Sequence, residues 1–158
     1  MRPRGTHCRG GIQALCEHPE QFDKLRRDPS LLPQAIEEML RWVTPVMQFR
    51  RTAMCDTKLG DQEIRKGDKV VMYYGAANRD PRVFENPEIF DITRKPNPHL
   101  AFGTGTHFCM GSHIARLEMR VTLEEFLRRF PDVSLAGPPE RLQSNFISGI
   151  KRMPINLA

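Results

Sequence analysis

The sequence predicts an α+β fold that is mainly helical, and three observations carry this prediction. Residues 33–43 repeat their apolar side chains with the 3.6-residue period of a helix. Residues 46–74 contain two strand-like segments with turn residues between them. Residues 111–130 form a long amphipathic segment that Pro131 ends. With 158 residues, the chain is long enough for one hydrophobic core.

The first segment follows the turn Asp28-Pro29-Ser30 and opens at Pro33. Four of its apolar side chains fall at positions i, i+3, i+4 and i+7: Ile36, Met39, Leu40 and Val43. Glu38 and Arg41 are three residues apart and are therefore neighbours on the opposite face of the helix. Because such pairs are usually exposed and contribute little stability, the helix alone does not assign them a role.

The central part of the chain contains the expected strands. Val46–Ala53 and Lys69–Tyr74 are strand candidates, and Leu59–Ile64 has the turn residues of a hairpin. From Ala76 to His99 the sequence has no regular period. A loop of this length is usually either functional or disordered.

A single cysteine lies between glycines in the segment Phe102–Gly111, just ahead of the long helix. Glycines at 103, 105 and 111 permit backbone conformations closed to other residues and let a flat ligand approach closely. The amide groups at the start of the helix point back toward Cys109, so the helix dipole favours an ionised sulfur. A structural cysteine buried in a glycine-rich turn is the alternative.

The segment Phe102–Gly111 resembles the haem-ligand loop of the cytochrome P450 family. It opens with an aromatic residue, and it has a basic residue two before the cysteine and a glycine two after it. The Glu38–Arg41 pair is similar to the E-x-x-R pair of that family and stands upstream in the expected order. The resemblance is to the C-terminal portion of soluble bacterial members and begins near Leu15. It implies haem b, with the Cys109 thiolate as the axial iron ligand that favours O–O cleavage.

The same resemblance implies the order of the parts: the E-x-x-R helix, a small β-sheet, an ordered meander, the cysteine loop and the following long helix. Seven apolar residues of the long helix are expected to pack beneath the cofactor: Ile114, Leu117, Val121, Leu123, Phe126, Leu127 and Phe130. Residues 132–135 and 144–154 resemble the C-terminal strands of the family, whose turn touches substrate.

Further residues acquire haem-binding roles by the resemblance. Arg51 and His107 match residues that contact the haem propionates, and both side chains suit a carboxylate. Phe102, Gly103 and Gly111 belong to the loop that holds the cofactor.

The Glu38–Arg41 pair is expected to be buried behind the haem, where it organises the cysteine loop. Many family members add an arginine at the position of Ile89, so this chain lacks the usual third member. Arg94 or His99 is expected to replace it, because either side chain can donate to a carboxylate or a carbonyl.

The resemblance also indicates where substrate and electron donor bind. Val46, Met47, Phe146 and Ile147, with Thr44 and Pro45, are expected to line the pocket for a hydrophobic substrate. Arg116 and Arg120 lie near the start of the long helix, where family members receive an acidic ferredoxin or flavoprotein. A solvated cationic face is an equal alternative for these two arginines.

The resemblance predicts a haem-binding portion, residues 15–158, after a remnant or unrelated segment, residues 1–14. The implied function is that of a monooxygenase, which uses O₂ and electrons from a redox partner to insert one oxygen atom into a hydrophobic substrate. No counterpart of the distal acid/alcohol pair is found, so no catalytic residue is assigned. A truncated, inactive fragment is therefore the main alternative, and a basic nucleic-acid-binding protein is a remote one.

Composition and charge argue against several other classes of protein. The net charge is +5, but the basic residues are scattered among nineteen acids without a clustered stripe, which argues against nucleic acid. No apolar run approaches a membrane span, and no signal peptide follows Met1. The four cysteines form no C-x-x-C pair, which argues against zinc and a disulfide framework. We therefore expect a cytoplasmic protein.

Overall fold

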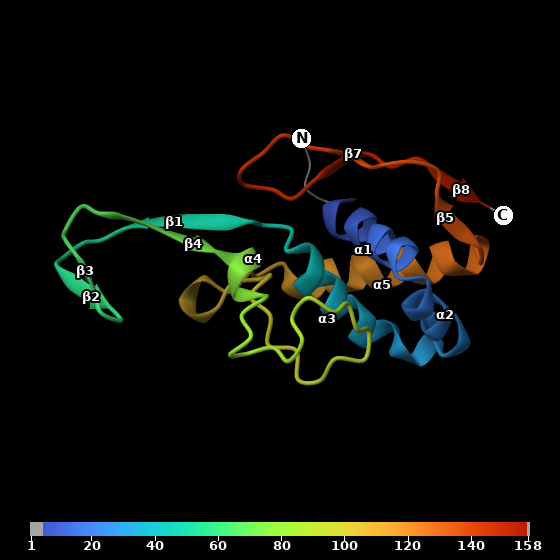
Figure 1. Cartoon of the computed structure of the whole chain (residues 1–158), viewed down its shortest axis with the longest axis horizontal. Helices are drawn as coiled ribbons and strands as arrows, with labels where there is room; N and C mark the ends of the chain where they lie inside the picture. The colour runs from blue at the N-terminus through green and yellow to red at the C-terminus, as the bar shows by residue number, and fades with distance from the viewer. Residues whose placement is uncertain (1–4, 158) are drawn as a thin grey trace.

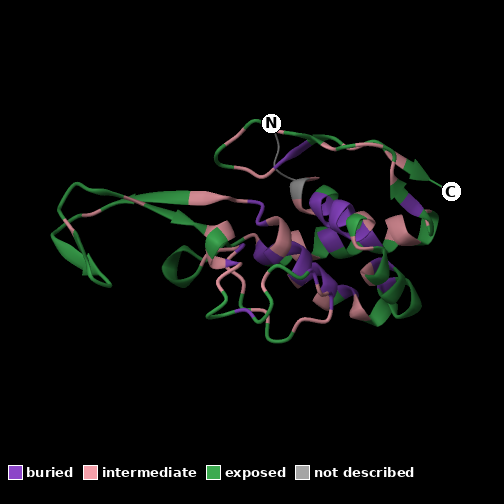
Figure 2. Cartoon of the chain, in the orientation of Figure 1, coloured by how far each residue is buried: buried purple, intermediate pink, exposed green. Residues whose placement is uncertain are grey.

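The computed structural model describes residues 5–157, and its centre is a group of packed helices (Figure 1). These are α1 (Thr6–Glu17), α2 (Pro19–Arg27), α3 (Leu32–Val43) and α5 (Ser112–Arg129), with a short 3₁₀ turn, η2 (Pro29–Leu31), before α3. Buried side chains concentrate in these helices (Figure 2). No helix in this part of the chain is both long and apolar enough to cross a membrane.

Helix α1 crosses the boundary that we expected between residues 14 and 15 without a break. Cys8, Ile12 and Ala14 on one side of the boundary and Leu15 on the other are buried in the common core. Two glycines let α1 approach α3 closely, since a Cβ at Gly10 would lie 2.7 Å from Val43 and one at Gly11 would lie 2.7 Å from Met39. Residues 1–4 of the expected N-terminal segment lie outside the described residues.

An extended arm leaves the helical centre (Figure 1). Strand β1 (Gln48–Thr52) pairs antiparallel with β4 (Lys69–Tyr73), so that Gln48 faces Tyr73 and Thr52 faces Lys69. The tip of the arm is the hairpin of β2 (Thr57–Leu59) and β3 (Gln62–Ile64), which turns at Gly60 with a φ of 59°. Most of the arm is exposed (Figure 2). The segments expected as strands and hairpin are therefore present.

The C-terminal segment forms two further antiparallel pairs. Strand β5 (Val133–Leu135) pairs with β8 (Ile155–Leu157), and β6 (Glu140–Arg141) pairs with β7 (Ile150–Arg152). The strands within residues 5–157 thus form four two-stranded sheets instead of one small sheet. Each strand pair has at most five paired positions, and no strand within residues 5–157 belongs to more than one pair.

The meander begins after the short helix α4 (Tyr74–Ala77) and continues to His99 without regular structure. Three buried apolar side chains, those of Phe84, Phe90 and Ile92, anchor it against the core. A single 3₁₀ turn, η3 (Gly105–His107), then lies within the cysteine loop. The expected long, ordered meander is present.

Helix α5 has two apolar stripes that face different surroundings. Met119 and Leu123 are buried, and Phe126, Leu127 and Phe130 pack against the same core. A second stripe has exposed fractions of 54% to 64% and consists of Ile114, Leu117 and Val121. Of the seven residues expected beneath a cofactor, the last four therefore pack against the helical core, whereas the first three are exposed.

Candidate functional site

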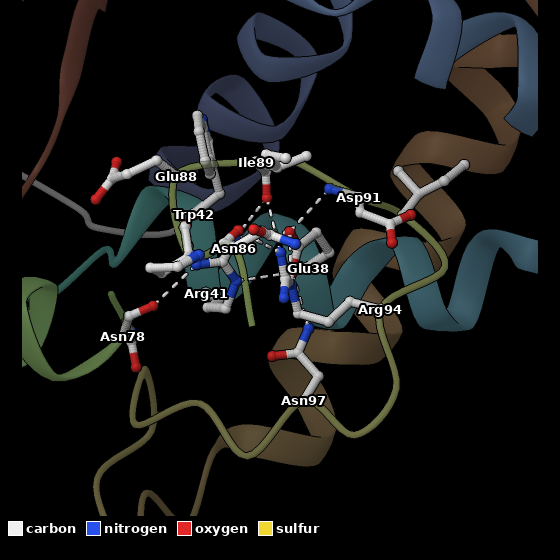
Figure 3. Close-up of polar contacts among 12 residues, drawn as sticks. Glu38, Arg41, Trp42, Asn78, Asn86, Glu88, Ile89, Asp91, Arg94 and Asn97 are labelled. Carbon is white, nitrogen blue, oxygen red and sulfur yellow. Dashed lines mark hydrogen bonds and ion pairs between the residues drawn. The ribbon is translucent and has the colours of Figure 1, made fainter. Parts of the chain in front are cut away.

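A buried ion pair lies at the centre of the site (Figure 3). Both side chains, those of Glu38 and Arg41, are 0% exposed. The Arg41 Nε donates to Glu38 Oε2 at 2.8 Å, and Arg41 Nη2 donates to Glu38 Oε1 at 2.7 Å. The carboxylate and the guanidinium therefore meet in the two-bond arrangement that gives the strongest arginine contacts.

The remaining donors of Arg41 bind main-chain carbonyls of the meander. Nη1 donates to the carbonyls of Asn78 and Pro87, both at 2.9 Å, and Nη2 donates to that of Ile89 at 3.1 Å. All five N–H groups of this guanidinium are thus satisfied. A buried arginine is tolerable only when its donors are paired in this way.

Arg94 supplies the second cation next to Glu38, and its side chain is 10% exposed. Its Nε lies 3.2 Å from Glu38 Oε2, while its terminal nitrogens donate to the carbonyls of Glu85, Asn86 and Ile89. The Ile89 side chain is 55% exposed, so position 89 contributes only its carbonyl. Of the two expected replacements, Arg94 and His99, Arg94 is therefore the one that reaches the buried pair.

Sequence reasoning missed two asparagines that complete this network. Asn97 Nδ2 donates to Glu38 Oε2 at 3.0 Å. Asn78 is 0% exposed, donates to Thr44 Oγ1 at 2.9 Å and accepts from the Leu100 amide at 2.7 Å. Neither residue has a spacing signal in the sequence, because each partner lies far along the chain.

The cysteine loop holds Cys109 at the surface through its backbone. The Cys109 amide donates to the Phe102 carbonyl at 2.9 Å, and the Ser112 amide donates to the Cys109 carbonyl at 3.1 Å. Gly103 and Gly105 have φ values of 73° and 62°, which residues with a side chain rarely adopt. Gly111 has a φ of −81°, so Gly103 and Gly105, but not Gly111, adopt the backbone conformation that only glycine readily permits.

The other cysteines have different surroundings. Burial raises the pKa of the Cys8 and Cys16 thiols, with further contributions from neighbouring carboxylates. Cys55 is exposed and lies between strands β1 and β2 of the arm. Cys109 therefore combines exposure with a loop of fixed geometry.

The two expected propionate contacts, Arg51 and His107, are both exposed, and no ion pair within residues 5–157 involves either of them. The Arg51 guanidinium lies over the Phe49 ring at 5.5 Å. Phe49 also contacts Tyr74, with ring centroids 5.9 Å apart. The Tyr74 hydroxyl lies 3.5 Å from the place where a side chain on Gly103 would begin. An aromatic path thus joins strand β1 to the cysteine loop.

The four expected substrate contacts come together from opposite ends of the chain. Val46 forms an antiparallel bridge with Ile147, and the Met47 amide donates to the Phe146 carbonyl at 2.9 Å. Phe146 meets Phe49 edge to face at 5.4 Å. The segment around residue 46 and the C-terminal turn therefore form one local surface.

Arg116 is engaged by Glu37, the residue before Glu38. The Arg116 Nε and Nη2 donate to Glu37 at 2.6 and 2.7 Å, and His99 Nε2 lies 3.0 Å from the same carboxylate. Partial burial would raise the pKa of Glu37, but the hydrogen bonds from Arg116 and His99 and the charge of Arg116 lower it to about 2. Arg120 is exposed and lies 3.6 Å from Glu124.

Comparison with known proteins agrees with this architecture. Residues 14–153 match the family model described as Cytochrome P450. Putative cytochrome P450 126 of Mycobacterium tuberculosis is 51% identical over 148 residues, which cover 94% of this chain and 36% of the relative. Steroid C26-monooxygenase of the same species is 46% identical over 149 residues, which cover 92% of this chain and 40% of the relative.

A solved structure extends the agreement to the fold. P450BioI, in complex with an acyl carrier protein that carries hexadec-9Z-enoic acid, superimposes with a TM-score of 0.96 at 38% identity. The match covers 99% of this chain and 41% of that chain. The expected mixed architecture is confirmed. The chain spans 36% and 40% of the length of the two curated relatives above.

We predict that Glu38→Ala lowers the free energy of unfolding by about 3 to 5 kcal/mol, because it leaves Arg41 and Arg94 buried without a counter-charge. The matched control is Glu125→Ala, which removes an exposed carboxylate that also binds two arginines, Arg128 and Arg129. Urea denaturation followed by circular dichroism measures both variants. Equal effects would show that the buried network contributes no more than a surface pair.

The lowered pKa of Glu37 predicts an acid-dependent contribution to stability. Because the folded pKa of about 2 lies below the ordinary 4.5, stabilisation by this carboxylate is complete above pH 4.5 and is lost as the pH falls toward 2. The stability difference between the wild type and Glu37→Gln should therefore shrink over this range. Denaturation of both proteins at a series of pH values measures it, and a difference that stays constant with pH would contradict the assignment.

Proposed function

The chain belongs to the cytochrome P450 family, and we propose that it binds haem b through Cys109 as part of a monooxygenase. The observation that supports this proposal most directly is the Cys109 loop. Its sulfur is exposed, its backbone is fixed by the Phe102 carbonyl, and two glycines in left-handed conformations shape the turn. Such a loop holds the backbone of one exposed cysteine in a defined geometry.

The residues around this loop suit haem. Arg51 and His107 are cationic or hydrogen-bonding groups without a carboxylate partner among residues 5–157, as the two haem propionates require. A Cβ at Gly111 would lie 3.8 Å from the Cys109 sulfur, in van der Waals contact with it, so this glycine stands directly beside the proposed ligand atom. Phe102 and Gly103 complete the loop. Among the four cysteines, the buried thiols of Cys8 and Cys16 are poor candidates for a thiolate.

When bound, haem supplies the redox-active iron at which O₂ is activated and one oxygen atom enters the substrate. The chain contributes position and charge. The thiolate of Cys109 holds the cofactor, Arg51 and His107 neutralise its carboxylates, and the Glu38 network keeps the meander in place.

A hydrophobic molecule is the proposed substrate. One relative is named a steroid C26-monooxygenase, and one solved structure holds a fatty acyl chain on a carrier protein. The surface formed by Val46, Met47, Phe146 and Ile147 supplies apolar side chains for such a molecule. Electrons would come from a ferredoxin or flavoprotein in the cytoplasm. Arg120 is the better docking residue of the expected two, because its side chain is 54% exposed and lies 3.6 Å from Glu124, whereas Arg116 is 31% exposed and donates two short hydrogen bonds to Glu37.

A second candidate is a haem-binding chain that does not turn over substrate alone. It is favoured by the share of the relatives that the chain spans, 36% and 40% of their lengths. Proton delivery to bound oxygen needs a positioned donor and a site that excludes bulk water. No residue of this chain has been assigned that task.

Haem ligation tests the first proposal. The reduced, carbon monoxide-bound wild type should show the strongly red-shifted Soret band of thiolate ligation, and Cys109→Ala should lose it. Cys55→Ala is the matched control, because it removes the other exposed cysteine. Retention of the band in Cys109→Ala, with loss in Cys55→Ala or Cys16→Ala, would reject the assignment.

Electron use distinguishes the two candidates. With haem and an electron donor supplied, we predict that the chain alone forms mainly peroxide and little hydroxylated product. The measurement counts product and peroxide per electron consumed over a panel of steroids and fatty acids. Efficient coupling to product would show that residues of this chain deliver protons to oxygen, and the non-catalytic reading would then be abandoned.

A further inference from the structure

A second carboxylate on α3 connects the two ends of the cysteine loop. Glu37 accepts from His99, which precedes the loop, and from Arg116, which follows it on α5. The His99 side chain is 3% exposed, while those of Arg116 and Glu37 are 31% and 29% exposed. We name Glu37, His99 and Arg116 the Glu37 clamp.

The hydrogen-bond pattern fixes the ring of His99. Its Nδ1 lies 3.2 Å from the backbone nitrogen of Ala101, and a backbone N–H can only donate. Nδ1 is therefore the acceptor, and Nε2 carries the hydrogen that is donated to Glu37. The imidazole thus joins the start of the loop to α3 through both of its nitrogens.

The clamp reaches Cys109 through Phe102. The Arg116 guanidinium lies over the Phe102 ring at 4.6 Å, and the His99 ring lies 6.2 Å from it. The carbonyl of the same residue accepts the Cys109 amide at 2.9 Å. A short path of contacts therefore leads from one carboxylate to the backbone of the proposed ligand.

The neighbouring carboxylate has a different set of partners. Among the described residues, Glu38 is hydrogen-bonded to Arg41, Asp91, Arg94 and Asn97, which belong to its own helix and the meander. No such contact of Glu38 reaches residues 102–111. The sequence resemblance gave the task of organising the cysteine loop to the Glu38–Arg41 pair, whereas the direct contacts to both ends of the loop come from Glu37.

We propose that Glu37 is a positioning residue that acts through His99 and Arg116 to hold Cys109 in the geometry for haem ligation. The term ligation rests on the proposed function, but the effect on the loop does not. The test therefore uses both the haem-free and the haem-loaded chain. Glu37→Gln keeps the size of the side chain and removes its charge, and Glu125→Gln makes the same change in an exposed arginine-paired carboxylate at the other end of α5.

In the haem-free chain, amide hydrogen exchange reports on the loop. Glu37→Gln should speed exchange of the Cys109 amide by about tenfold, since the loop loses its charge-assisted bonds to α3. Exchange in α1, whose described residues form no hydrogen bond with Glu37, His99 or Arg116, should stay as in the wild type. Unchanged protection of the Cys109 amide would overturn the proposal. If Glu37→Gln loses its helical circular dichroism, Arg116→Lys gives the same comparison. Lysine keeps the positive charge but cannot donate the two parallel hydrogen bonds of the guanidinium.

In the haem-loaded chain, the carbon monoxide complex reports on the ligand. The fraction with the red-shifted Soret band should fall in Glu37→Gln and stay unchanged in Glu125→Gln. A normal band in Glu37→Gln, with normal exchange, rejects the clamp while haem-thiolate binding stands. Absence of the band from the wild type, with faster exchange in Glu37→Gln, rejects the proposed function while the clamp stands.

Discussion

The buried carboxylate of Glu38 is the constraint on which the rest of the structure depends. A charge removed from water is costly unless opposite charge and hydrogen bonds surround it, and here two guanidinium groups, one amide side chain and one backbone amide do so. The guanidiniums in turn hold the carbonyls of residues 78, 85, 86, 87 and 89. Helix α3 and the meander therefore have to assemble together.

Adjacent carboxylates on one helix divide the work. Successive residues of a helix point in directions about 100° apart, so Glu37 and Glu38 address different neighbours from the same turn. Glu38 binds the meander, and Glu37 binds His99 and Arg116, which flank the cysteine loop on its two sides. Helix α3 is thus the common reference for two segments without regular structure of their own. Its position is fixed from the other side by the close crossing with α1 at Gly10 and Gly11.

Local patterns in the sequence were sufficient for the elements, because a helical or strand period is carried by neighbouring residues. They located α3, the arm, α5 and the loop around Cys109. These local patterns could not identify contacts between residues that lie far apart in the chain. Nothing near Asn78 indicates that it bonds Thr44 and Leu100, and the spacing of residues could not choose between Arg94 and His99. The sequence likewise does not indicate which of the apolar residues on the two sides of α5 are buried in the core and which are exposed.

The contacts that position the proposed ligand all lie within residues 5–157, whereas much apolar surface has no partner there. The stripe of Ile114, Leu117 and Val121 and the side chain of Met110, which is 97% exposed, are examples. The geometry of the Cys109 loop depends on α3, the meander and α5, each of which packs within the described core. The apolar stripe on α5 lies outside these contacts and outside the buried core of the described residues. The placement of the proposed ligand therefore depends on the partly buried hydrogen-bond network and not on this exposed apolar surface.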